Sequence, residues 1–564
     1  MRRWRVPRVD EALACGLAER LGVSRVLARL LVARGYDAAT AERFLSPSAD
    51  DLHSPWLMSG MELAARRLRR AIDQREPILL CGDYDVDGTL AVVVLLTAIR
   101  LAGGEADYHV PHRIKDGYGI RPEVVERAAA SGVRLLVSVD TGIRAVEAVQ
   151  RASALGIDVI ITDHHLPEGD LPPALSVLNP NRPGCRYPNK DLCGAGIAYK
   201  LATALLEGLD WPPGKAERVS QSLLKLVAVA TVADLVPLRE ENRVLVALGL
   251  AGLRERKHPG LAELLRVAGI AAGEAPSARQ VGFQIGPRIN AAGRMEDARQ
   301  VVELLTTADA ARAAEIAGHL DQLNQERQQL EQRIRDEIFQ RITEPPPGMV
   351  LAGEHWRRGV AGIVASRVVE RYHRPVFVLE IDRAQGVAVG SGRSIPGFHL
   401  LEALESMRDL FQKFGGHQFA AGVTVPLDRV AEFQRRFEEF AASRLSAEDL
   451  APELRLDGEA ALADFGPDLL AEIERMQPFG HGNPEPLWLV RDLRIEAVRP
   501  MGGSGRHFRL TVEQGGRRAL LKLWDFAARD RELVAGRRID GAVRIEADSY
   551  SGWSISARDL REAL

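Results

Sequence analysis

Short apolar runs alternate with amphipathic stretches in the first third of the chain. The runs 77–81, 134–139 and 157–162 are rich in Val, Ile and Leu and have the length of buried strands. Two stretches that separate these runs, 121–131 and 144–155, carry apolar residues at helical spacing. Strands that alternate with helices predict a parallel sheet with right-handed crossovers, so we expect an α/β fold.

Acidic residues and histidines follow each of the three predicted strands. They are Asp83, Asp85 and Asp87 after the first strand, Asp140 after the second, and Asp163, His164 and His165 after the third. Parallel strands present their carboxyl ends at one edge of the sheet, so these side chains are expected to converge. Oxygen ligands of this kind suit Mg²⁺ or Mn²⁺. A solvated acidic turn explains one such cluster but not three. An EF-hand is excluded because Val94 stands where its last Glu would be.

A further carboxylate, Asp234, is the only acid in the apolar segment 223–237. Burying an unpaired carboxylate costs several kcal/mol. Asp234 therefore either caps the local structure or faces a cation. Beside the other acids, we favour a metal ligand.

The remaining pattern predicts further domains. Residues 309–342 form one helical stretch with little Gly or Pro, which at 1.5 Å per residue spans about 50 Å. Its apolar positions keep no clean heptad, so a bridge between two lobes is favoured over a coiled coil. The strand-rich C-terminus suggests a small barrel of the OB type. The expected organisation is an N-terminal helical segment (1–55), an acid-bearing α/β domain (56–300), a long connecting helix (301–345), a smaller α/β domain (346–450), a linker (451–486) and an OB-type β-barrel (487–564).

Composition adds few constraints. The 564 residues carry a formal net charge of −3, so the chain is no polyanion binder by bulk charge. Arginine outnumbers lysine 66 to 8, which a GC-rich genome explains, although single guanidinium groups suit phosphate. Four cysteines without a Cys-x-x-Cys pair indicate a reducing cytoplasm. No signal peptide is expected, and no run approaches the roughly 20 apolar residues of a membrane span.

The motifs together resemble the DHH phosphoesterase superfamily. They begin with Asp83–Gly88 (Asp-Tyr-Asp-Val-Asp-Gly), Asp140, Asp163–His165 (Asp-His-His) and Thr231–Asp234 (Thr-Val-Ala-Asp). Five later motifs follow in the family's order, at 286–294, 359–367, 390–394, 414–417 and 478–486. With the length of the chain, these motifs are similar to the bacterial single-strand-specific DNA exonucleases of this superfamily.

The resemblance implies a DHH catalytic domain, a DHH-associated domain and a site for two Mn²⁺ or Mg²⁺ ions. The implied metal ligands are Asp85, Asp87, Asp140, His164 and Asp234, with Asp140 as the bridge. Asp163 and His165 are implied to lie behind these ligands or against the phosphate. Some relatives place a His ligand at the position of Cys81. A thiol is a poor Mg²⁺ ligand, so Cys81 is left out and one ion is expected to be held more loosely.

These residues predict phosphodiester hydrolysis. Two cations about 3.5–4 Å apart activate water and stabilise the entering and leaving oxygens. The candidate catalytic residues are His165, as proton donor or as a partner that orients His164, together with Asp163 and His417. We expect a terminal 5′-phosphate to be bound by Ser391, Arg393, Arg113 and Arg288. A surface ion pair is the alternative for Arg288 and is favoured for Arg294.

The C-terminal segment indicates the substrate. Residues 487–564 contain 15 Lys and Arg against 11 Asp and Glu, with aromatic rings on which bases can stack. We therefore expect an exonuclease that degrades single-stranded DNA to mononucleotides in repair and recombination; its 5′-to-3′ polarity is implied by the resemblance. A single-strand-binding protein is a candidate partner, and no membrane association is expected. The alternatives are a DHH-type oligonucleotide phosphodiesterase and a non-catalytic DNA-binding scaffold.

Overall fold

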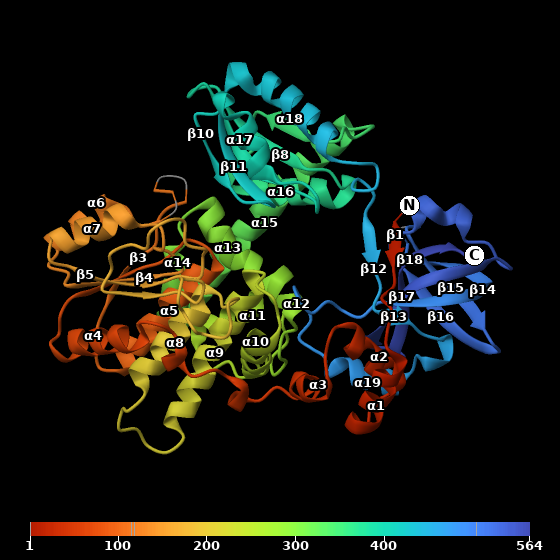
Figure 1. Ribbon diagram of the computed structural model, residues 1–564, viewed down its shortest axis with the longest axis horizontal. Helices are drawn as coiled ribbons and strands as arrows, with labels where there is room; N and C mark the ends of the chain where they lie inside the picture. The colour runs from red at the N-terminus through yellow and green to blue at the C-terminus, as the bar shows by residue number, and fades with distance from the viewer. Residues whose placement is uncertain (1, 114–115, 118, 504, 564) are drawn as a thin grey trace.

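The computed structural model describes residues 2–113, 116–117, 119–503 and 505–563. Three bodies are visible in Figure 1: an α/β domain with a helical layer, a smaller α/β domain above it, and a barrel module to one side. In the described part of the chain, no helix combines the length and apolar character needed to cross a bilayer.

The first domain is built on a five-stranded parallel sheet in the order β3-β2-β4-β5-β6. The three predicted strands and both predicted helices are confirmed, and two short edge strands, β3 and β6, complete the sheet. The elements are α4 (Met61–Asp73), β2 (Ile78–Cys81), α5 (Val86–Leu101), β3 (Asp107–His109), α6 (Pro122–Ala130), β4 (Leu135–Val139), α7 (Val146–Ala154), β5 (Asp158–Thr162), β6 (Ser176–Leu178) and α8 (Gly194–Leu206).

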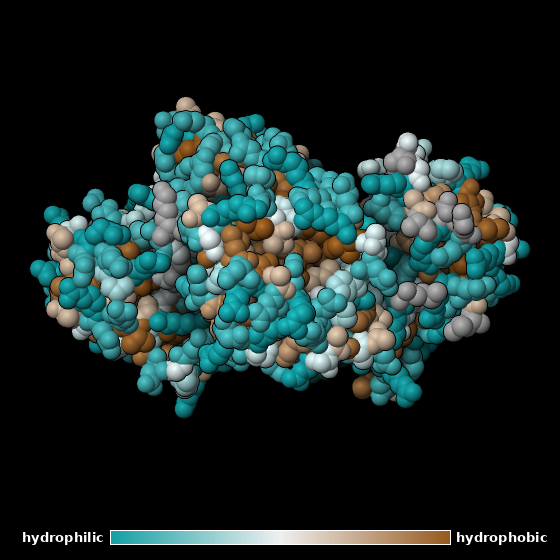
Figure 2. All heavy atoms as spheres, turned by 90° about the horizontal axis from the view of Figure 1, so that it is seen from above, coloured by the Kyte–Doolittle hydropathy of each residue, from teal (hydrophilic) through white to brown (hydrophobic). Residues whose placement is uncertain are grey.

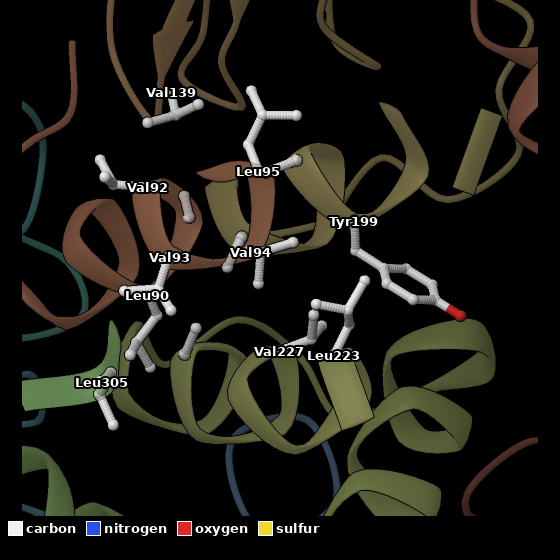
Figure 3. Close-up of a cluster of buried hydrophobic side chains, with 14 of the residues drawn as sticks. Leu90, Val92, Val93, Val94, Leu95, Val139, Tyr199, Leu223, Val227 and Leu305 are labelled. Atoms are coloured by element: carbon white, nitrogen blue, oxygen red, sulfur yellow. The ribbon is translucent and has the colours of Figure 1, made fainter. Parts of the chain in front are cut away.

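The two faces of this sheet are covered by different helices. Helices α6 and α7 pack on one face, and α4, α5 and α8 on the other. Helix α5 is buried on nearly all sides because a further helical layer covers it. Figure 3 shows its Val94 facing Leu223 and Val227 of α9, and its Leu90 on the side of Leu305 of α14. The layer consists of α9 (Lys215–Ala233), α10 (Glu240–Gly252), α11 (Pro259–Val267), α12 (Ala278–Gln280), a π-helical turn (Val281–Ile285), α13 (Gly286–Met295) and α14 (Arg299–Thr306).

The predicted connecting helix is present as α15 (Ala310–Arg341), with Asp309 as its N-cap. It packs against α13 below and α16 above, so it bridges the two lobes. The upper lobe is a five-stranded mixed sheet in the order β10-β11-β9-β8-β7. Its elements are β7 (Met349–Gly353), α16 (Arg358–Tyr372), β8 (Val376–Asp382), β9 (Val387–Arg393), α17 (Leu400–Ser406), β10 (Lys413–Gly416), β11 (Ala420–Pro426) and α18 (Val430–Arg444).

The barrel is a closed sheet of antiparallel and parallel pairs, consistent with the expected OB type. Its strands are β13 (Gly458–Glu459), β14 (Trp488–Met501), β15 (His507–Gln514), β16 (Arg517–Leu523), β17 (Arg538–Asp548) and β18 (Gly552–Glu562), with a short helical segment at Ala527–Glu532.

Two boundaries differ from the sequence interpretation. Residues 451–486 are not a plain linker, because they include β12 (Glu453–Arg455), β13 and helix α19 (Pro467–Glu474). The N-terminal segment does not stand alone: β1 (Arg3–Arg5) pairs with β12, and the helices share one core with α19 and the barrel. The helices are α1 (Glu11–Leu21), α2 (Arg25–Ala33) and α3 (Ala38–Leu45). We call β1, α1–α3, β12, α19 and the barrel strands the barrel module. Local periodicity cannot reveal a pairing between segments this far apart in sequence.

Candidate metal and phosphate site

The turn after β2 is shaped to present carboxylates. Asp85 is the N-cap of α5, and its side chain accepts a hydrogen bond from the Gly88 N–H at 3.0 Å. A Cβ on Gly88 would lie 2.7 Å from Asp83 Cβ, so only glycine fits the turn. The next carboxylate, Asp87, lies in the first turn of α5 and accepts a hydrogen bond from the Ala195 N–H at the start of α8, at 2.8 Å.

One histidine nitrogen faces three carboxylates from three separate elements. His164 Nε2 lies 3.3 Å from an oxygen of Asp140, 3.8 Å from Asp234 and 3.9 Å from Asp87. Asp140 directly follows β4 and lies in the left-handed region, at φ 60°, and Asp234 is the C-cap of α9. The expected convergence of these four side chains is therefore present in the structure.

A second group shares Asp140. One carboxylate oxygen from each of Asp83, Asp85 and Asp140 lies within 4.8 Å of the others. Burial, followed by the neighbouring carboxylates, raises the pKa of all three, and it raises the pKa of Asp234 in the same way. Buried oxygens of Asp83 and Asp140 have no hydrogen-bond partner. Buried like charges with unsatisfied oxygens fit a site for divalent cations, and Asp140 is placed where it can serve both groups.

Asp163 and His165, which follow β5, have different surroundings. Asp163 is fully buried and accepts hydrogen bonds from the N–H groups of Ile143, at 2.8 Å, and His165, at 3.1 Å. Its other contact is with His165 Nδ1 at 2.7 Å. Burial lowers the pKa of His165, but the hydrogen bond and charge of Asp163 outweigh it, so the pKa is raised. Asp163 thus fixes the orientation of the His165 ring.

Arginines from both lobes gather beside the acids. The guanidinium of Arg113 lies over the Tyr84 ring at 4.9 Å, and its charge opposes the raised pKa of Asp83 and Asp85. Arg294 lies in the last turn of α13 and donates to the Gly359 carbonyl at 3.1 Å. Burial, with the nearby charge of Arg113, lowers the pKa of Arg294 to about 9. Like-charged guanidinium groups held together indicate an anion site.

The second lobe contributes Arg393 at the end of β9. Its guanidinium lies against α16, where a Cβ on Gly362 would be 2.9 Å from Nη2. Burial and the charge of Arg113 lower the pKa of Arg393. Ser391 stands two residues earlier on the same strand and so faces the same side. His417 is exposed in the turn between β10 and β11. Its N–H donates to the Ala420 carbonyl at 2.8 Å, and Ala420 in turn pairs with Arg393 on β9.

Two other sequence candidates lie in different surroundings. Arg288 Nε donates to Asp321 of α15 at 2.8 Å, which favours the ion-pair alternative. Cys81 is buried in β2, and burial raises the pKa of its thiol to about 12. In the described residues, Cys81 belongs to none of the groups of potential metal ligands.

Sequence reasoning undervalued two positions. The sequence favours a surface ion pair for Arg294, whereas in the structure this residue closes the Gly286–Arg294 motif and lies beside the acids. Gly194 was not singled out, yet a Cβ there would lie 2.4 Å from Asp140 Cβ. The glycines of the Cys193–Gly196 run were the only available signal, and glycine alone is too common to point to a site.

The fold and the acid-lined sheet edge define a DHH-type phosphoesterase. Residues 77–231 match the DHH family N-terminal domain, residues 346–443 match the DHHA1 domain, and residues 456–555 match the RecJ OB domain.

Related proteins identify the family within this class. The single-stranded-DNA-specific exonuclease RecJ of Dickeya dadantii is 39% identical over 85% of this chain and 87% of the relative. The Bacillus subtilis protein of the same name is 40% identical over 90% of this chain, and the alignment covers 64% of that relative's length. The chain therefore belongs to the RecJ family, the exonuclease family that the motifs predicted.

Solved structures agree with this assignment. The crystal structure of Thermus thermophilus RecJ with Mn²⁺ superposes with a TM-score of 0.85 at 30% identity, over 100% of this chain and 80% of that one. The same protein with Mg²⁺ superposes with a TM-score of 0.79 at 29% identity, over 100% of this chain and 79% of that one.

Proposed function

We propose that this protein is a metal-dependent exonuclease that degrades single-stranded DNA from its 5′ end to mononucleotides. The observation that carries the proposal is the buried acid cluster, with unsatisfied oxygens on Asp83 and Asp140, facing a group of arginines across the two lobes. The buried carboxylates need cations to neutralise them, and the arginines that face them need an anion. A phosphodiester strand with divalent cations satisfies both.

Asp85, Asp87, Asp140, His164 and Asp234 are the residues that would hold two Mn²⁺ or Mg²⁺ ions. When bound, two such ions supply a nucleophile at neutral pH and stabilise the charge on the phosphate oxygens. The chain contributes the geometry. The start of α8 orients Asp87, and the left-handed conformation of Asp140 turns its carboxylate toward both acid groups. Only glycine fits at position 194, because a Cβ there would collide with the Asp140 side chain.

His165 is the proposed proton donor to the leaving oxygen. Its Nδ1 is engaged by Asp163, so the proton that it can transfer is on Nε2. The raised pKa keeps a larger share of the ring protonated near neutral pH. The carbonyl of His165 accepts a hydrogen bond from the Asn179 amide at 2.8 Å, which holds the backbone of the motif in place.

Arg113, Arg294, Arg393 and Ser391 would bind the terminal 5′-phosphate. Arg393 belongs to the DHHA1 lobe and Arg113 to the DHH lobe, so a bound phosphate joins the two. A terminal monoester carries more charge than an internal diester, which gives the pocket its preference for an end. Fixing the end places one scissile bond over the acid cluster and yields mononucleotides. His417, in the turn between β10 and β11, is proposed to contact the same phosphate.

The proposal extends to the cellular setting of the reaction. All four cysteines are free thiols, which suits a reducing cytoplasm. A role in DNA repair and recombination, and collaboration with a single-strand-binding protein, follow from the family assignment.

End-labelled strands test the proposal directly. A 5′-phosphorylated strand of about 40 nucleotides, which exceeds the roughly 4–16 nucleotides that an OB fold covers, is labelled at one end or the other. It is then incubated with Mn²⁺, Mg²⁺ or a chelator. The expected result is early release of the 5′ label as a mononucleotide, only with metal. Early release of the 3′ label, or internal fragments, would refute the polarity. Activity in the chelator would refute the metal site.

A further inference from the structure

The proposed chemistry gives no role to the motif at 478–486. In the structure this segment lies between α19 and β14, against the catalytic domain. We call residues 475–484 the strap. Its partner is residues 237–243, which follow the proposed ligand Asp234 and begin helix α10.

Backbone groups join the strap to the catalytic domain. The Leu238 N–H donates to the His481 carbonyl at 2.7 Å, and Arg239 Nε donates to the Gly482 carbonyl at 2.9 Å. Glycines permit this approach. A Cβ on Gly480 would lie 2.7 Å from Leu238 Cδ1, and a Cβ on Gly482 would lie 2.9 Å from Pro237 Cβ. Gly482 also has a φ of +76°, which favours glycine.

Arg243 reaches from the catalytic domain into the barrel module. Its side chain is 2% exposed and donates to the carbonyls of Arg475, at 2.9 Å, and Gln477, at 2.6 Å, just beyond α19. The guanidinium also lies over the Phe44 ring of α3, with its carbon 4.2 Å from the ring centroid. Burial lowers the pKa of Arg243 to about 10. The carbonyls that follow a helix attract a cation, so Arg243 ties the catalytic domain to two parts of the barrel module at once.

The strap is held firmly on the barrel side. The Asn483 amide donates to the carbonyls of Met476 and Pro478, both at 2.9 Å. Arg34 of the N-terminal helical region donates to Asn483 Oδ1 at 2.9 Å. Met476 belongs to the core of the barrel module, whereas Leu238 belongs to the core of the catalytic domain. The strap is therefore a polar and glycine-rich contact between two separate hydrophobic cores.

We propose that the strap is the joint that holds the barrel module in the orientation in which one DNA strand reaches both the barrel and the acid cluster. Arg243, Gly480 and Gly482 are its positioning residues. The inference rests on the proposed function, because it assumes that a strand bound by the barrel is presented to the cleavage site. Two sites that are held at a fixed separation bind one strand more tightly than either site alone.

The test uses the full chain with Gly482→Ala and Arg243→Met. Gly536→Ala is the matched control, because Gly536 has a φ of +89° but nothing within 4 Å of an added Cβ. Each protein is assayed on strands of about 40 and about 4 nucleotides, of which only the longer can also occupy the barrel. Small-angle scattering of the free proteins reports the placement of the modules.

A loosened joint lowers the effective concentration of strand at the cleavage site. We expect both strap variants to raise KM on the long strand about tenfold, with kcat and KM on the short strand unchanged. The distribution of interatomic distances obtained from their scattering should broaden. Gly536→Ala should match the wild type in every assay.

Two results would refute the proposal that the strap is a joint. The first is an unchanged long-strand KM and scattering profile in variants that remain folded by circular dichroism. The second is an equal loss on both strands together with weaker Mn²⁺ binding by calorimetry, because the strap would then act on the nearby Asp234. If the wild type hydrolyses neither strand, the proposed function fails, and the scattering comparison still tests the joint.

Discussion

The acid-lined sheet edge and the barrel both contain many charges but arrange them in opposite ways. At the sheet edge, buried carboxylates from β2, β4 and α9 face one another, and the arginines across from them are likewise gathered together. On the barrel, arginines pair with carboxylates across neighbouring strands, as Arg494 does with Glu513 at 3.2 Å. Figure 2 shows a largely hydrophilic surface, with hydrophobic residues gathered near the middle of that face.

Charges in the two regions differ in whether they are paired. Paired surface charges cancel and contribute little to stability or binding. Buried charges of one sign persist only where a ligand of the other sign completes them, so they mark function. The excess of Lys and Arg in residues 487–564 is therefore weaker evidence for DNA binding than the few arginines between the lobes.

The largest effect is expected from removing Asp140, the acid that both groups of potential metal ligands share. Asp140→Asn is expected to reduce kcat by about 10⁴-fold or more, the scale at which one member of a catalytic group is lost. Strand binding measured in a chelator should be retained, because the arginines are unchanged. Asp170→Asn, at an exposed acid, is the control. Near-normal turnover by Asp140→Asn would contradict the two-metal site.

His165→Ala should have the next largest effect. Loss of a proton donor reduces kcat by about 10²–10⁴-fold. Mn²⁺ binding by calorimetry should change little if His165 acts on the leaving group. Strongly weakened Mn²⁺ binding would show that His165 holds a metal or orients His164, which is the alternative role considered for it.

The arginine group can be separated residue by residue. Removing one charged hydrogen-bond donor to phosphate costs about 2 kcal/mol, a factor of about 30. We expect Arg393→Ala and Arg294→Ala to lose this much of the preference in kcat/KM for 5′-phosphorylated over 5′-hydroxyl strands. Arg288→Ala should keep the preference, since Arg288 pairs with Asp321. A preference that survives in all three variants would contradict the pocket.

Removal of divalent cations should make stability fall as pH rises. Burial and neighbouring carboxylates raise the pKa of Asp140 and Asp234, so the folded, metal-free protein holds protons that unfolding releases. This stability is fully present below the ordinary carboxyl pKa of about 4 and is lost as pH rises through the folded values. Thermal melting in a chelator should therefore show a Tm that falls with pH, with a shallower slope in Asp140→Asn/Asp234→Asn. A Tm independent of pH would contradict repulsion between the buried carboxylates.

The smallest effect is expected on the barrel. Arg491 pairs with Glu459 at a partly exposed position. Arg491→Ala should change the free energy of unfolding by less than about 1 kcal/mol. Strand affinity should stay close to the wild-type value in a binding titration. A loss as large as that of Arg393→Ala would show that paired barrel arginines bind DNA, against the comparison.

Much of the catalytic domain could be predicted from the sequence because its signals are local. The strands that end in Asp140 and Asp163 are short apolar runs, and parallel pairing places their ends at one edge. The long helix also follows from uninterrupted helical residues after the Asp309 cap. The sequence could not separate the roles of Asp163 and His165, because only folding shows that Asp163 is buried behind the ring.

Tertiary structure alone decided how distant segments meet. Whether Arg288 or Arg294 lies beside the acids depends on which side of α13 packs on α15, and no local sequence pattern determines that. The union of the N-terminal helices with the barrel, and the contact of Gly482 with Pro237, join residues more than 200 positions apart. Side-chain chemistry and short-range periodicity are written in the sequence itself, whereas the choice between ion pair and ligand site depends on neighbours that only the folded chain supplies.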